Sequence, residues 1–234
     1  INTVSKFLEK YNNQGKWLPM RPIQFDSSTL AGIPKNIEVN HIQSLEQNKF
    51  YFNADCTNQI FVLDLKTMVF KRLDITFYRG DNCHSYRFFR NGVPHSVGGY
   101  GFWRTNNHII YFDEKSKEWE AYISTGIPPL AINGGFVAYL PDKDELITFM
   151  NLSHDVNLNG GAIHRDRTIY SFSFRNKKWS TIGTVSSKKF IDLLEGTAPV
   201  FNKSICFTGN YFIVDNEIGS NDFYAINART LELL

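Results

Sequence analysis

Short apolar segments that end in a polar residue recur at similar intervals along this chain. The clearest copy occupies residues 95–119, where an apolar approach ends in Gly98-Gly99, a loop follows, and residues 109–112 run into Asp113. A polar turn then separates Asp113 from Trp119. Alternating apolar and polar positions bounded by turn residues are typical of half-buried β-strands. The stretch therefore predicts strand, loop, strand, tight turn and strand, which is most of one four-stranded antiparallel unit.

The same arrangement recurs when the chain is aligned on a large apolar anchor six places after a strand-ending polar residue. Four pairs of polar residue and anchor result: Asp64 and Phe70, Asp113 and Trp119, Ser173 and Trp179, and Asn227 and Leu233. The anchors stand 49, 60 and 54 residues apart. A period of this length is characteristic of stacked structural repeats. We therefore expect an all-β chain with repeats at about 39–75, 86–124, 133–184 and 198–234, whose anchors pack against the next repeat.

Residues 1–38 are expected to form a partial repeat or a helix, followed by a connector. Trp17 stands 53 residues before Phe70, which would make it a fifth anchor. A helix is the alternative, because its apolar spacing is also present at Val4, Phe7, Leu8 and Tyr11. Residues 188–195 form the other short helical pattern.

The repeat resembles that of the kelch family, in which a glycine pair ends the second strand, an aromatic residue ends the third and a tryptophan lies in the fourth. Gly98-Gly99, Phe112 and Trp119 match all three positions, and Phe172 and Trp179 match the last two. The resemblance covers about residues 39–234. It is degenerate, because other residues replace the glycine pair in the remaining copies: Asn53-Ala54, Met150-Asn151 and Thr208-Gly209. The resemblance implies a β-propeller of four-stranded antiparallel blades. Four to five repeats are present, which suit either a small propeller or part of a larger one.

Composition narrows the possible functions. The chain has 234 residues, of which 42% are hydrophobic and 15% aromatic, so it has enough apolar surface to form a folded core. A net charge of +2 gives no electrostatic reason to expect nucleic acid or an anionic membrane as partner. No apolar run approaches the ~20 residues that a membrane-spanning helix needs. The compartment stays open, with a cytoplasmic location favoured over secretion.

The cysteines are odd in number and widely spaced, at positions 56, 83 and 206. This is not the pattern of a disulfide-rich scaffold, nor does it contain a paired zinc motif. Buried free thiols are the favoured interpretation, and one disulfide with one free thiol is the alternative.

The segment 151–167 contains a candidate calcium site. Asp155, Asn157 and Asn159, followed by Gly160, match the opening of an EF-hand-type loop, and Asp166 falls at position twelve. The composition also suits an ordinary turn, so the favoured expectation is that the chain has no cofactor, and calcium is the alternative. His154 and His164 lie beside carboxylates and could bind a transition metal or transfer protons.

Three long segments are expected on one face of the chain: 78–85, 151–167 and 186–197. In antiparallel order, the loops between second and third strands lie at the same end of the sheets as the links between repeats. Rigid scaffolds concentrate binding residues on such loops. The candidate contact residues are Tyr78, Arg79, Asp81, Arg87, His154 and His164. In the segment 86–90, the alternative is that Phe88 is core and the arginines are solvated.

No nucleophile elbow, glycine-rich phosphate loop or paired metal motif is present, so no catalytic residue is expected. Some kelch-like proteins are copper oxidases or sugar mutarotases, but the oxidase constellation of Tyr, Cys and His is not found. The first hypothesis is a non-catalytic module that presents loops to a protein or peptide. The second is a propeller that binds or modifies carbohydrate at its central mouth, either alone or with the help of calcium.

Overall fold

The computed structural model describes residues 7–8, 21–26, 29, 39–44, 48–76, 82–102, 104–154, 163–186, 188, 191, 205–208, 211–215, 223–227 and 230. For residues 7–8, 39–44, 153–154, 163–164, 205–208, 211–215 and 223–226 only the backbone is described. Within these limits the chain is built from consecutive β-sheets.

Three larger sheets and a smaller fourth one follow one another along the sequence. Sheet I contains β4 (Val39–Ser44), β5 (Lys49–Ala54), β6 (Ile60–Asp64) and β7 (Val69–Arg72), and β3 (Gln24–Phe25) extends it in parallel beside β7. Sheet II contains β8 (Tyr86–Arg90), β9 (Val93–Val97), β12 (Ile109–Asp113) and β13 (Glu118–Ala121). Sheet III contains β14 (Phe136–Leu140), β15 (Glu145–Phe149), β18 (Thr168–Ser173) and β19 (Lys178–Thr184). Sheet IV contains β20 (Ile205–Thr208), β21 (Tyr211–Asp215) and β22 (Phe223–Asn227).

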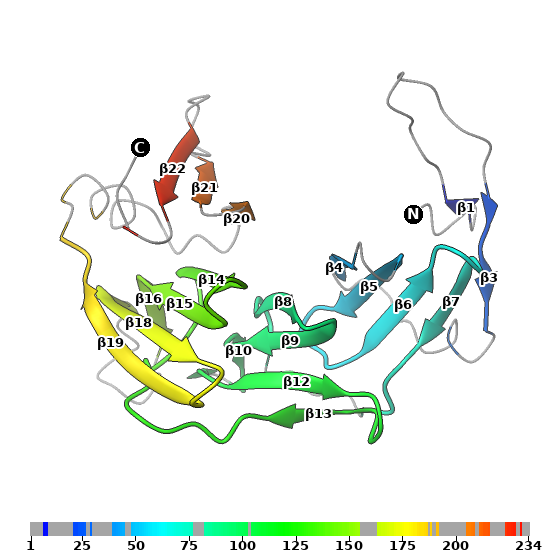
Figure 1. Cartoon of the computed structure of the whole chain (residues 1–234), viewed down its shortest axis with the longest axis horizontal. Coiled ribbons are helices and arrows are strands. Elements are labelled where there is room, and N and C mark those ends of the chain that lie inside the picture. The colour runs from blue at the N-terminus through cyan, green and yellow to red at the C-terminus, as the bar shows by residue number, and fades with distance from the viewer. Residues whose placement is uncertain are drawn as a thin grey trace.

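Three two-stranded pairs complete the described strands. They are β1 (Phe7–Leu8) with β2 (Arg21–Pro22), β10 (Tyr100–Gly101) with β11 (Arg104–Thr105), and β16 (Asn151–His154) with β17 (Ile163–Asp166). The prediction of an all-β chain with four-stranded antiparallel sheets is confirmed. Figure 1 shows the sheets along an open arc, with the edge strands β4, β8 and β14 toward its inner side.

The strand-turn-anchor pattern has a clear physical basis in sheets I to III. Each anchor lies directly opposite the last apolar residue of the preceding strand, giving the pairs Leu63–Phe70, Phe112–Trp119 and Phe172–Trp179. The last residue of the intervening turn has a positive φ in every case: 60° at Met68, 58° at Lys117 and 51° at Lys177. This shared turn geometry explains the constant spacing of six residues.

In sheets I, II and IV the polar residue before the turn accepts main-chain hydrogen bonds from the turn. Asp64 Oδ1 accepts from Lys66 N–H at 2.8 Å and from Thr67 N–H at 3.0 Å. Asp113 Oδ1 accepts from Lys115 N–H at 3.0 Å. These bonds lower the pKa values of both aspartates. In sheet IV, Asn227 Oδ1 accepts from Thr230 N–H at 3.2 Å, whereas its anchor Leu233 lies outside the described residues.

The segment that precedes each sheet is hydrogen-bonded to the outer turn of that sheet. Gln24 N–H donates to Met68 O at 2.9 Å, and Ile75 N–H donates to Lys117 O at 3.1 Å. A third bond of the same kind, 2.9 Å long, runs from Thr125 N–H to Lys177 O. The repeat therefore extends back to residue 24, in β3.

The core consists of apolar clusters between successive sheets. In β6, Ile60 and Val62 face sheet II while Phe61 and Leu63 face the other side, as the two-residue period of a strand requires. Trp119 packs on the cluster that contains Ile60 and Val62. Trp179 packs with residues of sheet II: Phe88, Val97 and Ile109. Trp119 and Trp179 thus contact the preceding sheet, and the expectation that an anchor packs against the following sheet is wrong for Trp119.

At the N-terminus, Phe7 pairs with Pro22 and Leu8 with Arg21 in an antiparallel ladder. The helix considered for this region is therefore wrong at Phe7 and Leu8, while Val4, Tyr11 and Trp17 lie outside the described residues. Most of the helical pattern at 188–195 lies outside them too. The described chain contains no helix with the length and hydrophobicity that a membrane span requires.

Candidate functional site

One end of sheets I to III carries the turns between second and third strands together with the links between sheets. Gly99 N–H donates to Ile132 O, and Ile132 N–H donates to Asn106 O, each at 2.8 Å. Leu152 N–H donates to Asn133 O, also at 2.8 Å. We call this end the loop face; its described segments are 54–60, 82–85, 98–102, 104–108, 131–135 and 150–153. Main-chain bonds of this kind hold its segments in fixed positions.

The predicted glycine pair lies where the loop of sheet II meets two links. Gly98 and Gly99 have φ values of +68° and +109°. A Cβ at Gly98 would lie 2.0 Å from Ile132 O, and one at Gly99 would lie 2.9 Å from Cys83 O. Both the backbone conformation and the lack of space therefore require glycine.

A disulfide joins two parts of the loop face. Cys56, in the turn between β5 and β6, is bonded to Cys83, in the link to sheet II, with an S–S distance of 2.05 Å. The expectation of free thiols is wrong for these residues, because the link returns to the loop end of sheet I before β8 begins. Cys206 lies in β20, and its side chain is outside the described set.

Arg87 is the most unusual charged residue near this face. It lies in β8, opposite Ser96, and points toward sheet I because its neighbour Phe88 faces sheet III. Its guanidinium carbon lies 5.8 Å from the centroid of the Trp119 ring. The residue as a whole is partly exposed, but its three guanidinium nitrogens are covered and have no hydrogen-bond partner among the described residues.

Burial lowers the pKa of Arg87 to about 10, and the charge of Asp55 opposes that shift. The side chain therefore remains charged at neutral pH. The alternative that the arginines of segment 86–90 are solvated is wrong for Arg87, which also lies in a strand and not in a loop.

Polar side chains from two segments lie around Arg87 and Trp119. Trp119 Nε1–H donates to Asn58 O at 2.7 Å, while Asn82 Nδ2–H donates to Thr57 O at 2.9 Å and to Asn58 Oδ1. Asp55 accepts from His84 N–H at 3.0 Å, and its carboxylate lies 3.5 Å from His84 Nδ1. We call this group, with Gln59, the Arg87 cluster; it consists of Asp55, Thr57, Asn58, Gln59, Asn82, His84, Arg87 and Trp119.

The Arg87 cluster also contains buried acceptors without donors. The side-chain oxygens Gln59 Oε1 and Asn82 Oδ1 have no hydrogen-bond partner in the described chain, and neither has the adjoining Asn53 Oδ1. Buried polar atoms normally have hydrogen-bond partners. A group of buried donors and acceptors without such partners among the described residues therefore indicates a place where another molecule could bind.

Arg90, three residues later on the same strand, has a very different environment. Its Nε and Nη2 donate to the two oxygens of Asp144 at 2.6 and 2.9 Å, and Tyr139 Oη–H donates to the same carboxylate at 3.0 Å. These bonds raise the pKa of Arg90 and lower that of Asp144. Nearby, His95 Nε2 lies 3.0 Å from Tyr122 Oη. This paired network stabilises the contact between sheets II and III.

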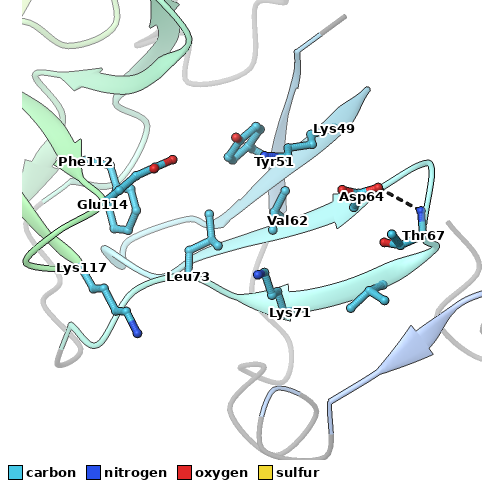
Figure 2. A pocket seen from close by; sticks show the side chains of 11 residues that line it. Lys49, Tyr51, Val62, Asp64, Thr67, Lys71, Leu73, Phe112, Glu114 and Lys117 are labelled. Carbon is cyan, nitrogen blue, oxygen red and sulfur yellow. Dashed lines mark hydrogen bonds between the residues drawn. The ribbon is translucent and has the colours of Figure 1, made fainter. Parts of the chain in front are cut away.

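A cleft of about 530 Å³ lies at the opposite end of the interface between sheets I and II. Figure 2 shows it between strands β5 to β7 on one side and Glu114 and Lys117 of the β12–β13 turn on the other. Its apolar lining comes mainly from Val62, Leu73 and Phe112. Tyr51 also lines this cleft and packs against Phe89 of sheet II, with ring centroids 5.0 Å apart.

The calcium and histidine candidates can be placed only in part. Asp166 Oδ1 accepts from Thr168 N–H at 2.9 Å and Oδ2 from Tyr170 Oη–H at 2.8 Å, so both oxygens support the start of β18. His154 and His164 occupy the paired strands β16 and β17, and their side chains are not described. No described residues form a group of three metal-binding side chains. Six further candidates lie outside the described residues: Tyr78, Arg79, Asp81, Asp155, Asn157 and Asn159.

Sequence reasoning missed Asp55, Asn58 and Asn82, and it considered one disulfide only as the alternative, without saying which cysteines would pair. The available signal was the similar composition of two segments: residues 55–59 and 81–85 each place a cysteine among Asp, Asn, Thr or Ser. When one polar segment precedes a pair of adjacent strands and a similar one follows it, the two segments can meet at the same end of the sheet.

The fold is similar to that of the solved structure of YjhT, with a TM-score of 0.60 and 13% sequence identity. The similarity covers 85% of this chain and 64% of that protein's chain, so this chain spans less than two thirds of its length. At this identity the likeness concerns the fold alone. No family model matches the chain, and no curated protein matches its sequence.

Proposed function

We propose that this chain forms part of a kelch-like β-propeller that binds a protein or peptide partner through its loop face, without catalysing a reaction. The observation that carries the proposal is the set of main-chain hydrogen bonds and the disulfide that join turns and links of three successive sheets. A pre-formed surface binds with little loss of conformational freedom. The repeated turn and link geometry of sheets I to III supports the propeller.

Exposed apolar side chains on this face support a protein partner. Phe102 is 69% exposed in the loop of sheet II, and Leu130, directly before the loop-face segment 131–135, is 77% exposed in the link to sheet III. The two segments are connected, because Asn107 Nδ2–H donates to Pro129 O at 2.6 Å. Large apolar residues on a rigid surface are typical centres of protein interfaces.

The test is selection from a random peptide library alongside a glycan array, with the purified chain as bait. The Phe102→Ser variant changes the loop face, and Lys71→Ser, in the cleft at the opposite end, is the matched control. We expect selected peptides whose affinity falls at least tenfold in Phe102→Ser and stays unchanged in Lys71→Ser. Binding of glycans alone would support the carbohydrate hypothesis instead, and peptides that lose affinity only in Lys71→Ser would contradict the loop face as the binding surface.

A further inference from the structure

Two arginines on one strand differ in whether their charge has a partner. Arg90 forms a two-pronged ion pair with Asp144, whereas the covered guanidinium of Arg87 forms no hydrogen bond within the described chain. A buried guanidinium is normally paired, because removing its charge from water without compensation is strongly unfavourable. Stacking on the Trp119 ring stabilises the charge of Arg87 but uses none of the N–H groups of the guanidinium. The interface between sheets I and II therefore holds donors that an anion would satisfy.

The position of Arg87 fits a ligand that approaches from the loop face. Arg87 lies opposite Ser96, two residues before Gly98, and so belongs to the loop end of β8. β8 is the edge strand of sheet II, and Arg87 as a residue is partly exposed there although its guanidinium nitrogens are covered. Binding of a ligand to the guanidinium therefore requires this side chain to turn outward.

The surroundings select the kind of anion. The planar guanidinium matches the oxygens of a carboxylate or a phosphate. The negative charge of Asp55 repels an anionic ligand, and the repulsion is weaker for a singly charged carboxylate than for a phosphate dianion. The orphan oxygens of Gln59 and Asn82 need N–H donors, which a peptide backbone supplies and a free carboxylate does not.

We propose that Arg87 is the binding residue for an acidic peptide segment, whose Asp or Glu carboxylate pairs with its guanidinium while backbone N–H groups donate to the neighbouring amide oxygens. The proposal rests on the proposed function and specifies the chemistry of the partner. It also explains why the covered guanidinium of Arg87 has no hydrogen-bond partner among the described residues: a residue that is unfavourable in the free protein becomes paired in the complex.

The test uses an end-blocked hexaglutamate peptide, with hexaglutamine, glucuronate and inorganic phosphate as comparison probes, titrated calorimetrically at pH 7 in about 0.15 M salt. We expect hexaglutamate to bind the unmodified chain and to lose at least tenfold in affinity with Arg87→Met. Hexaglutamine should not bind. Equal binding of hexaglutamate to the unmodified chain and Arg87→Met, or no binding at all, would overturn the proposal. Arg87-dependent binding of glucuronate or phosphate without hexaglutamate would overturn the peptide as ligand.

Thermal unfolding without ligand separates a binding role from a structural one. Arg87→Met should raise the melting temperature, because it removes an unpaired buried charge, whereas Arg90→Met should lower it by leaving Asp144 without its partner. A lower melting temperature for Arg87→Met would show that Arg87 stabilises the free fold, contrary to the proposal. Library peptides that depend on Phe102 but not on Arg87 would refute this inference and leave the proposed function intact.

Discussion

The indole N–H of Trp119 donates to the main-chain oxygen of Asn58 at 2.7 Å, across the interface between sheets II and I. The same ring lies edge-on to Phe112 and next to the guanidinium of Arg87. One side chain therefore links the repeat anchor of sheet II, the turn of sheet I and the candidate binding residue. Changes at Trp119 should affect both stability and the Arg87 cluster.

Trp119→Ala should lower the free energy of unfolding by about 3–5 kcal/mol, because it removes a large ring from an apolar inter-sheet cluster. Trp119→Phe keeps most of the apolar contact but leaves Asn58 O without its donor, so its cost should be smaller, about 1–3 kcal/mol. Urea denaturation of the three proteins measures both values. A loss near zero for Trp119→Ala would show that this residue is no inter-sheet anchor.

Gly98→Ala should destabilise the loop face strongly, since the added Cβ would meet Ile132 O at 2.0 Å in a backbone with φ of +68°. We expect a loss of at least about 2 kcal/mol, from the strained conformation and the displaced link together. Gly183→Ala is the matched control, because its nearest atom would be Ile169 Cδ1 at an ordinary 3.6 Å. Similar melting temperatures for the two variants would contradict the role of Gly98 in seating the link.

The sheets could be predicted from the sequence because their turns are local. The distance from Asp113 to Trp119 is set by a turn whose hydrogen bonds and positive φ involve only neighbouring residues. The anchor's partner sheet could not be predicted in this way, because the packing direction depends on which face of each strand meets the neighbouring sheet. The same spacing is compatible with packing against either neighbour.

The Arg87 cluster could not be predicted, because it is assembled from segments that are distant in sequence. Cys56 and Cys83 are separated by 27 positions, and nothing in their local sequence shows that they meet. An arginine among aromatic residues, as at Arg87, is equally compatible with a solvated side chain or a buried one. Only the strand register, which turns Phe88 toward sheet III, places Arg87 between sheets I and II.

Loss of the Cys56–Cys83 disulfide should lower the free energy of unfolding by about 2–4 kcal/mol, because the unfolded chain regains the freedom of the closed loop. The Cys56→Ser/Cys83→Ser double variant and chemical reduction should give similar losses. Peptide mapping without reduction should recover residues 56 and 83 in one cross-linked fragment. Separate, alkylatable peptides for both positions in the oxidised protein would contradict the bond.

Stability should fall on acidification because of His95, whose burial lowers its pKa from 6.5 to about 4. The folded chain favours the neutral ring, so this contribution is fully present above pH 6.5 and is lost as the pH falls from 6.5 to about 4. At pH 4, this lowered pKa of His95 reduces the free energy of unfolding by about 3 kcal/mol. Urea denaturation between pH 4 and 7.5 measures the slope.

The His95→Gln variant isolates this effect, because glutamine can still bond to Tyr122 but does not titrate. We expect a flatter dependence of unfolding free energy on pH in His95→Gln than in the unmodified chain. His108→Gln, at an exposed position outside the network, is the matched control and should keep the original slope. Carboxylates such as Asp144 titrate in all three proteins and cancel in the comparison. Parallel curves for His95→Gln and the unmodified chain would show that His95 does not carry the acid sensitivity of the interface between sheets II and III.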